Sequence, residues 1–140
     1  PALKKFKRIL EREGYTQKPV IKQAFIQYMP FKDNSFDIGI CTEVIEHTVE
    51  LDLAFKEMSR ILKKDGTLVI TFPIEKQRDK IYPIARLLGM NVNVLKEVTF
   101  FDYSSEVIIE KLKKNFTIKK SYKFPMIFPI TNLIVCENKK

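Results

Sequence analysis

Hydrophobic and polar positions follow two different periods between residues 36 and 73, and they predict a strand, a helix and a second strand. Phe36–Thr42 is a short, mostly apolar run of the kind found in buried parallel strands. Thr67–Phe72 is rich in β-branched residues and is followed by Pro73, which favours a second strand. Between the two runs, apolar residues recur at helical spacing on one face: Leu51, Ala54, Phe55, Met58, Ile61 and Leu62. Strand, helix and strand with short links form a βαβ unit, and Gly66 is expected at the left-handed stop after the helix.

The same patterns predict further elements on both sides of this unit. Helices are expected over Pro1–Glu13, Glu75–Leu88 (kinked at Pro83) and Ser104–Lys114, and strands over Val20–Ile26, Phe116–Phe124 and Thr131–Glu137. Ser104 is the expected N-cap of its helix. A chain of 140 residues fits one domain, so we expect a single domain over residues 1–140.

A series of short motifs lies in and around the βαβ unit. These are Met29-Pro30-Phe31, Phe36-Asp37, Glu46-His47, Arg60-Ile61-Leu62-Lys63 and Gly66. In this order and spacing they resemble the second half of a class I S-adenosylmethionine-dependent methyltransferase, of the broad group that acts on small molecules, lipids and quinones. The resemblance implies an α/β fold with a Rossmann-like, mainly parallel sheet and a C-terminal antiparallel hairpin. It also implies S-adenosyl-L-methionine as the cofactor.

The family's glycine-rich cofactor motif has no counterpart in this chain. The sequence has only four glycines, and none of them are clustered. The resemblance therefore covers almost the whole chain but only about the last two thirds of the family domain, with strands 1 and 2 missing. Three explanations remain open: a fragment of a longer protein, a natural short form that works with a partner, or a relative without catalysis.

The missing strands would leave a gap of about 14 Å between the strand at Val20–Ile26 and the strand at Phe36–Thr42, which is three strand spacings. Unpaired strand edges inside a core cost free energy and invite association. We therefore expect either that Val20–Ile26 moves next to Phe36–Thr42 or that another chain fills the gap.

The single histidine, His47, is the candidate general base, because imidazole titrates near neutral pH and can accept a proton from a methyl acceptor. The alternative is that His47 orients the start of the next helix beside Glu46. The carboxylates of Glu43 and Glu46 could orient His47 or contact a substrate, or could favour the positive end of the helix.

The resemblance also assigns four cofactor-binding positions. Cys41 and Thr42 match residues that line the methionine end of the cofactor, and Ile26 and Gln27 match residues that flank its adenine. Phe25 stands where the family usually has an acid. The alternative for all four is packing at the ends of strands. Four aromatic residues are candidates for an acceptor pocket or for the core: Tyr82, Phe100, Phe101 and Tyr103.

Charge and composition narrow the choice of partners. The net charge of +8 keeps nucleic acid and anionic lipid among the candidates, although the lysines look scattered rather than interleaved with aromatics, as on solvated faces. The two cysteines lack the paired spacing of a zinc site, and no cluster of metal ligands surrounds the histidine. Two cysteines and no signal peptide favour the cytoplasm, and no apolar run has the roughly 18–20 residues that span a bilayer.

The leading functional prediction is methyl transfer from S-adenosyl-L-methionine to an unidentified small-molecule or lipid acceptor. The second is a non-catalytic methyltransferase-like subunit or scaffold that binds a partner, and the third is a basic nucleic-acid-binding module. A second copy or a partner chain that completes the sheet fits the first two.

Overall fold

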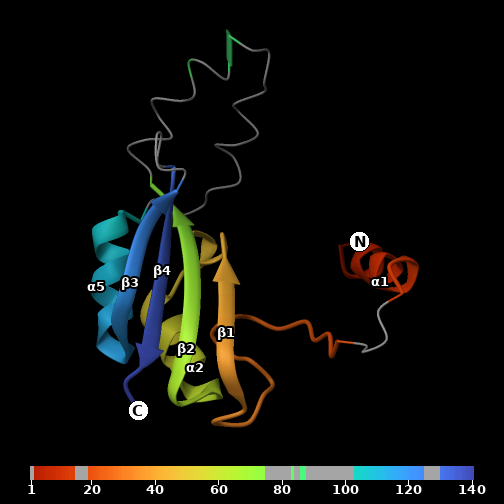
Figure 1. Ribbon diagram of the computed structural model, residues 1–140, viewed down its shortest axis with the longest axis horizontal. Helices are drawn as coiled ribbons and strands as arrows, with labels where there is room; N and C mark the ends of the chain where they lie inside the picture. Colours follow the sequence, from red (N-terminus) through yellow and green to blue (C-terminus); the bar gives the residue numbers. More distant parts are fainter. Residues whose placement is uncertain (1, 15–18, 75–82, 84–85, 88–102, 125–129) are drawn as a thin grey trace.

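The structure is a computed structural model that describes residues 2–14, 19–74, 83, 86–87, 103–124 and 130–140. Its elements, labelled in Figure 1, are helix α1 (Ala2–Arg12), strand β1 (Phe36–Thr42), the 3₁₀ helix η1 (Ile45–His47), helix α2 (Leu51–Ile61), strand β2 (Leu62–Pro73), helix α5 (Ser105–Asn115), strand β3 (Phe116–Phe124) and strand β4 (Thr131–Asn138).

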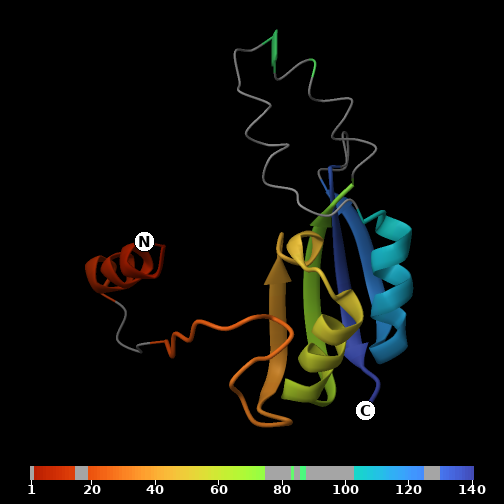
Figure 2. The same cartoon turned by 180° about the vertical axis from the view of Figure 1, so that it is seen from behind.

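The four strands form one sheet in the order β1-β2-β4-β3. β1 pairs with β2 in parallel, whereas β4 is antiparallel to both of its neighbours, β2 and β3. Helices α2 and α5 contact each other and lie on the same face of the sheet (Figures 1 and 2). The α/β fold class and the C-terminal antiparallel hairpin are therefore as predicted.

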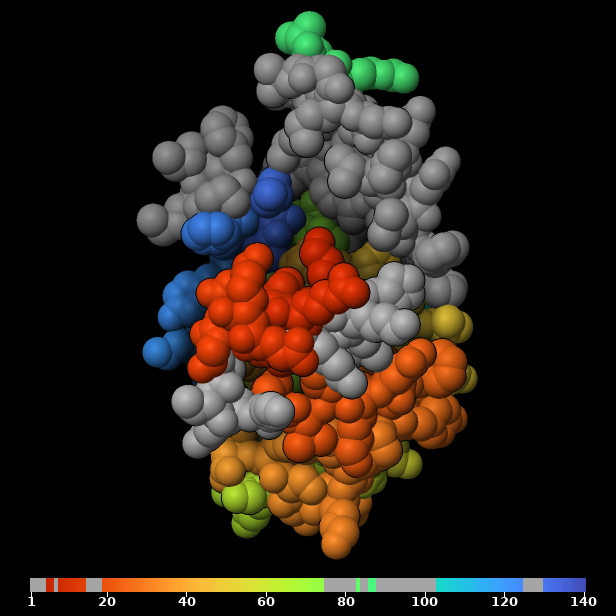
Figure 3. All heavy atoms as spheres, turned by 90° about the vertical axis from the view of Figure 1, so that its right-hand side faces the viewer, coloured from red at the N-terminus to blue at the C-terminus, as the bar shows by residue number. Residues whose placement is uncertain are grey.

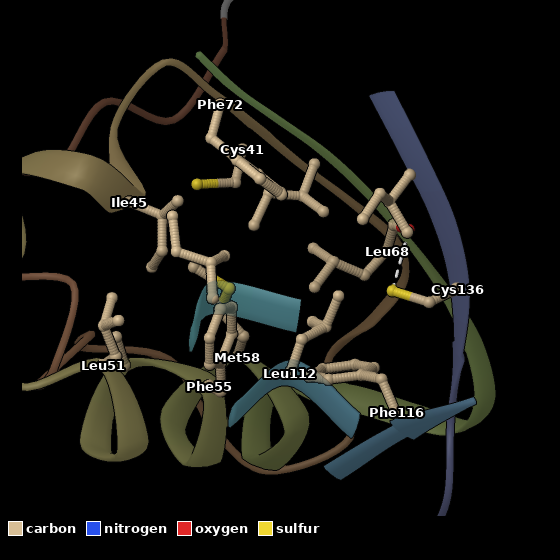
Figure 4. Close-up of a cluster of buried hydrophobic side chains, with 14 of the residues drawn as sticks. Cys41, Ile45, Leu51, Phe55, Met58, Leu68, Phe72, Leu112, Phe116 and Cys136 are labelled. Carbon is tan, nitrogen blue, oxygen red and sulfur yellow. Dashed lines mark hydrogen bonds between the residues drawn. The ribbon is translucent and has the colours of Figure 1, made fainter. Parts of the chain in front are cut away.

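The core lies between this face of the sheet and the two helices (Figure 4). Alternate residues of β2 and β4 point into it, as the period of two in a strand requires. The largest fully buried apolar side chains are Phe55, Phe72, Phe116, Ile45, Leu51, Leu62, Leu68, Ile70, Ile108, Leu112 and Ile134. They come from η1, α2, α5 and three strands, so burial of apolar surface is what joins the βαβ unit to the C-terminal hairpin.

A buried asparagine at the end of β4 ties the hairpin to the end of α2. The Asn138 side-chain amide donates to the carbonyl oxygens of Ser59 (2.9 Å), Leu62 (3.3 Å) and Lys63 (3.1 Å). Its oxygen accepts from the Ser59 hydroxyl at 2.6 Å. These bonds satisfy carbonyl groups at the helix end, which have no partner within the helix.

A second polar cluster fixes the segment that leads into β1. Arg60 donates to the carbonyl oxygens of Met29 (3.0 Å) and Phe31 (2.8 Å) and forms ion pairs with Glu57 and Asp33. Glu57 Oε1 accepts from the Met29 amide at 2.7 Å. The Met29-Pro30-Phe31 motif and the arginine of the helix-end motif are therefore in direct contact.

Most of the predicted elements are confirmed. The helix at the N-terminus, the strand Phe36–Thr42, the helix that begins at Leu51, the two last strands and the N-cap at Ser104 occur as expected, and the Ser104 hydroxyl accepts from the Val107 amide. Most of the Glu75–Leu88 helix prediction lies outside the described residues, as do Tyr82, Phe100 and Phe101.

The predicted strand at Val20–Ile26 is wrong. These residues form no strand, and the one bridge in this segment joins Phe25 to Tyr28. The segment does not move next to β1 either. Figures 1 and 2 show it leading away from β1 to α1, which stands apart from the sheet. In Figure 3, which views the molecule from the α1 side, α1 and this segment lie in front of the sheet. A strand needs a partner, and this segment pairs with no strand of the described sheet, although one edge of β1 is free.

Two local expectations also need correction. Asp65, with φ of 59°, takes the left-handed conformation that was expected at Gly66, and β2 already begins at Leu62. β1 is parallel to β2 as predicted, but it is not buried on both faces. Ile38 and Ile40 are 62% and 73% exposed, because they lie on the sheet face away from α2 and α5, whereas Cys41 on the other face is buried.

Candidate functional site

The carboxyl ends of β1 and β2 lie side by side, because the two strands are parallel and paired up to Thr42 and Thr71. At this edge the chain leaves β1 sharply. Glu43 has φ of 50°, in the left-handed region, and its amide donates to the Thr71 carbonyl oxygen at 3.1 Å. Open α/β sheets bind ligands beyond the carboxyl ends of their parallel strands. The end of β1 is therefore the place in the described chain where a ligand site is expected.

The two residues that end β1 have different environments. Cys41 is buried and points into the core beside Phe72 and Ile45, whereas Thr42 is exposed (Figure 4). Burial raises the pKa of the Cys41 thiol to about 12, and the nearby Glu46 carboxylate adds to this effect. A thiol that stays protonated at neutral pH is a poor nucleophile, so Cys41 does not act as one.

The short helix η1 carries the Glu46-His47 pair next to this edge. Glu46 is buried, and one of its carboxylate oxygens lies 3.9 Å from His47 Nε2. His47 keeps about a third of its side chain exposed, so a molecule at the site can reach it. At 3.9 Å the contact is electrostatic rather than a hydrogen bond.

Backbone and side-chain bonds hold η1 in place. The Thr48 amide donates to the Ile45 carbonyl oxygen, and the Thr48 hydroxyl donates to that of Val44. From the start of α5, the Tyr103 hydroxyl donates to the Val49 carbonyl oxygen at 2.6 Å. Tyr103, an acceptor-pocket candidate in the sequence, therefore holds the loop that carries His47.

The two predicted adenine-side residues lie on another segment. Ile26 is half-buried and packs against the core, and Gln27 is half-buried. Phe25, which replaces the family's usual acid, is 79% exposed. Cys41, Thr42 and His47 thus lie at one edge of the sheet. Ile26 and Gln27 lie elsewhere in the chain, just before the Met29–Phe31 segment that Glu57 and Arg60 hold. Thr71 was missed in the sequence, although its place at the end of a predicted parallel strand was a usable signal.

The residues present form only one side of a cofactor site. The free edge of β1 carries exposed isoleucines and pairs with no other described strand. The chain also has no cluster of glycines that would let backbone approach a nucleotide closely. The described residues therefore do not enclose S-adenosylmethionine by themselves. They also contain no group of three or more metal-binding side chains, and none of their helices is long and apolar enough to cross a membrane.

Comparisons with known proteins identify the family. A model of the methyltransferase domain matches residues 1–70, which is half of the chain. A ubiquinone/menaquinone biosynthesis C-methyltransferase of Hahella chejuensis is 29% identical over 101 residues, covering 68% of this chain and 41% of that protein. The crystal structure of a Pyrococcus horikoshii protein has a TM-score of 0.71 and 19% identity, and the match covers 97% of this chain and 66% of that one. An S-adenosylmethionine-dependent methyltransferase structure from Methanosarcina mazei has a TM-score of 0.58 and 15% identity, covering 84% and 66%.

The fold and the matched domain are those of class I S-adenosylmethionine-dependent methyltransferases. The chain belongs to the methyltransferase domain family, and the cofactor that this family implies is S-adenosyl-L-methionine, as predicted. The chain spans less than half of the length of the quinone methyltransferase and 66% of each of the two solved structures.

Proposed function

We propose that this chain forms the acceptor side of an S-adenosylmethionine-dependent methyltransferase, and that its cofactor site is complete only when further polypeptide covers the free edge of β1. The observation that carries this proposal is the arrangement at the carboxyl end of β1. Thr42, the left-handed turn at Glu43 and the exposed His47 all lie at the edge where a parallel sheet binds its ligand.

The free edge of β1 supports the second part of the proposal. Its backbone groups have no partner strand on that side in the described chain, and Ile38 and Ile40 point away from the helices into solvent. The Pyrococcus horikoshii structure matches 97% of this chain, which includes nearly all of α1 and the segment after it, yet a third of that structure has no counterpart here. The uncovered strand edge is a fitting place for the remaining third.

Within this function each candidate residue has a distinct role. Thr42 and Cys41 contribute the strand end that faces the methionine part of the cofactor, and Ile26 and Gln27 contribute to the adenine side. His47 accepts the proton from an acceptor, and the Glu46 carboxylate beside it orients the imidazole. Transfer from a sulfonium needs alignment more than covalent help, so positioning by these residues is their main contribution.

Two relatives support a choice of acceptor class to test first. The Hahella chejuensis relative is a C-methyltransferase of ubiquinone and menaquinone biosynthesis, and another relative is an O-methyltransferase that acts on malonyl-acyl-carrier protein. We assign a small organic acceptor, with a quinone-like lipid as the first candidate to test.

Calorimetric titration with S-adenosylhomocysteine, together with the mass of the chain in solution, tests the proposal. Micromolar binding is expected in any species whose β1 edge is covered, and Ile40→Lys should abolish it, because a charge at this face opposes the covering polypeptide. If the monomer binds S-adenosylhomocysteine and Ile40→Lys does not change the affinity, the cofactor site does not need further polypeptide over β1, and the proposal is contradicted.

One alternative function has a specific observation in its favour. The exposed Phe25 at the family's acid position suits a non-catalytic methyltransferase-like scaffold that no longer recognises adenine. The same titration decides between the methyltransferase and the scaffold. A scaffold should not bind S-adenosylhomocysteine, whether the chain is a monomer or has a mass that shows an added polypeptide.

A further inference from the structure

The loop that carries His47 connects β1 to α2, and the hydrogen bonds within it are local. The His47 amide donates to the Val44 carbonyl oxygen at 3.1 Å. The Thr48 amide donates to the Ile45 carbonyl oxygen, also at 3.1 Å. These bonds close η1 on itself, and burial of Ile45 in the core is not directional. The position of His47 relative to the sheet must therefore be set by further contacts.

Two side-chain hydroxyl groups from other elements bond the two ends of this loop. At its start, the Glu43 amide donates to Thr71 Oγ1 at 3.2 Å, as well as to the Thr71 carbonyl oxygen at 3.1 Å. At its end, the Tyr103 hydroxyl donates to the Val49 carbonyl oxygen at 2.6 Å. His47 thus lies between two hydrogen bonds that join residues 28 and 54 positions apart in the sequence.

Both hydroxyl groups belong to residues that are themselves held in place. Thr71 pairs with Thr42 of β1 and with Leu133 of β4, so it lies inside the sheet, and its β-branched side chain has few rotamers. Tyr103 is half-buried, packs against the core and directly precedes Ser104, the N-cap of α5. The start of the loop is therefore fixed to the sheet, and its end is fixed to α5.

Stability alone does not account for these two hydroxyl groups. Val49 is 59% exposed and Glu43 is also exposed, so water can replace either hydroxyl group. A hydrogen bond that is exchanged for one to water contributes little net stability. It still selects one position for the backbone group that it bonds, which water does not. The two bonds therefore matter more for where the loop lies than for whether the chain folds.

We propose that Thr71 and Tyr103 are positioning residues, which hold His47 in place for proton transfer by bonding the two ends of its loop. This role rests on the proposed function, in which His47 is the general base. A general base must lie within about 2.6–3.2 Å of the group whose proton it takes, so a ring displaced by about 1 Å loses much of its effect. Thr71 and Tyr103 act through the backbone of Glu43 and Val49 and not on the acceptor itself.

NMR spectroscopy of the full chain tests the proposal, because His47 is the only histidine and its ring gives one set of signals. Tyr103→Phe and Thr71→Val each remove one hydroxyl group and keep the shape of the side chain. Each should raise the hydrogen-exchange rates of the His47 and Thr48 amides by about threefold to tenfold, the effect of losing one hydrogen bond. Relaxation of the His47 ring signals should show one orientation in the wild type and several in each variant. Thr71→Ser keeps the hydroxyl group and should restore the wild-type values.

Matched controls separate positioning from a general loss of stability. Thr67→Val and Tyr122→Phe remove the same hydroxyl groups elsewhere on the sheet and should leave the His47 and Thr48 amides unchanged. The Leu62 amide, at the far end of α2, should change much less than these two amides in every variant. An equal increase at Leu62, or an unchanged His47 ring and unchanged amides, would overturn the proposal.

These measurements need no cofactor, so they separate the positioning role from the proposed function. If His47 is unaffected by the loss of either hydroxyl group, the positioning role alone is contradicted. If no species of the chain binds S-adenosylhomocysteine in the titration described above, the proposed function is contradicted, whatever the His47 signals show.

Discussion

At the scale of single residues, two polar side chains hold together parts of the chain that are distant in sequence. Asn138 bonds three carbonyl groups at the end of α2 from the last residues of β4. Glu57 and its partner Arg60, in the second half of α2, form hydrogen bonds with the Met29–Phe31 segment. Asn138 and the Glu57–Arg60 pair form hydrogen bonds with backbone groups that would otherwise be buried without a partner. Removing either should therefore destabilise the fold by the desolvation cost of the backbone groups left unpaired.

Asn138→Ala should lower the free energy of unfolding by about 2–3 kcal/mol, because it leaves buried carbonyl groups and the Ser59 hydroxyl without their partner. Urea denaturation should show a lower midpoint with an unchanged slope. Ser121→Ala, at an exposed position of β3, serves as the control and should change stability by less than about 0.5 kcal/mol. A midpoint unchanged in the Asn138 variant would show that water replaces the amide.

Glu57→Gln should destabilise the chain at neutral pH by about 1 kcal/mol. Hydrogen bonds from Arg60 hold the pKa of the Glu57 carboxyl below its usual range, and the Met29 amide adds to this effect. A lowered folded-state pKa contributes stability above the unfolded value of about 4.3, and this contribution is lost as the pH falls through the folded value. The difference between wild type and variant should therefore shrink on acidification below about pH 4. A difference that stays constant from pH 7 to pH 3 would rule out this linkage.

At the scale of elements, the junction between α2 and β2 is tighter than a glycine-capped helix end. α2 ends at Ile61, Leu62 is already extended, and the left-handed residue is Asp65. Gly66 is needed for space instead. A Cβ atom there would lie 2.9 Å from the Lys63 carbonyl oxygen and 3.2 Å from that of Asp37.

Gly66→Ala should therefore cost about 1–3 kcal/mol of stability, because backbone atoms must move to admit the methyl group. Gly39→Ala is the matched comparison. Its Cβ would meet only side-chain atoms of Leu68 and Leu62, at 3.4 Å or more, and it should cost much less. Thermal melting of the two variants side by side measures the difference, and equal melting temperatures would contradict the steric argument.

Elements that carry their own periodicity could be predicted from the sequence, and those defined by a partner could not. The apolar stripe of α2, the alternation of β4 and the cap at Ser104 are local signals, and each element occurs where expected. Val20–Ile26 has a strand-like composition but pairs with no strand in the described sheet, and composition does not reveal pairing. Similarly, the end of β1 could be predicted as a site from its position. That Tyr122 and Phe124 share one exposed face of β3 depends on hairpin register, which composition does not reveal.

At the scale of the whole molecule, the described chain consists of one four-stranded sheet with α2 and α5 on one face, and of the helix α1, which stands apart from the sheet. α2, α5 and the four strands share one core, whereas Phe6 and Ile9 of α1 remain partly exposed. α1 is basic and amphipathic, and none of the extensive contacts between the described elements involves it.

Deletion of residues 1–13 should therefore change the free energy of unfolding of the remaining chain by less than about 1 kcal/mol, as expected for a segment with few contacts. Urea denaturation of the shortened and full chains makes the comparison, with circular dichroism to confirm that α2 and α5 persist. A loss above about 2 kcal/mol would mean that α1 packs on the sheet in solution, since that is the scale of a buried apolar side chain.

The strand order has a consequence for how the chain acquires its structure during synthesis. β4 is the last strand in the sequence, yet it lies between β2 and β3 and supplies the only pairing that β3 has in the described chain. A nascent chain that has emerged as far as Phe124 thus has a βαβ unit, but β3 lacks its neighbour. When residues 131–138 follow, the sheet closes and Asn138 locks onto α2. Translation pauses placed before residue 131 should therefore prolong a species in which β2 and β3 both lack their neighbour β4, and chaperones bind species with unpaired strand edges of this kind.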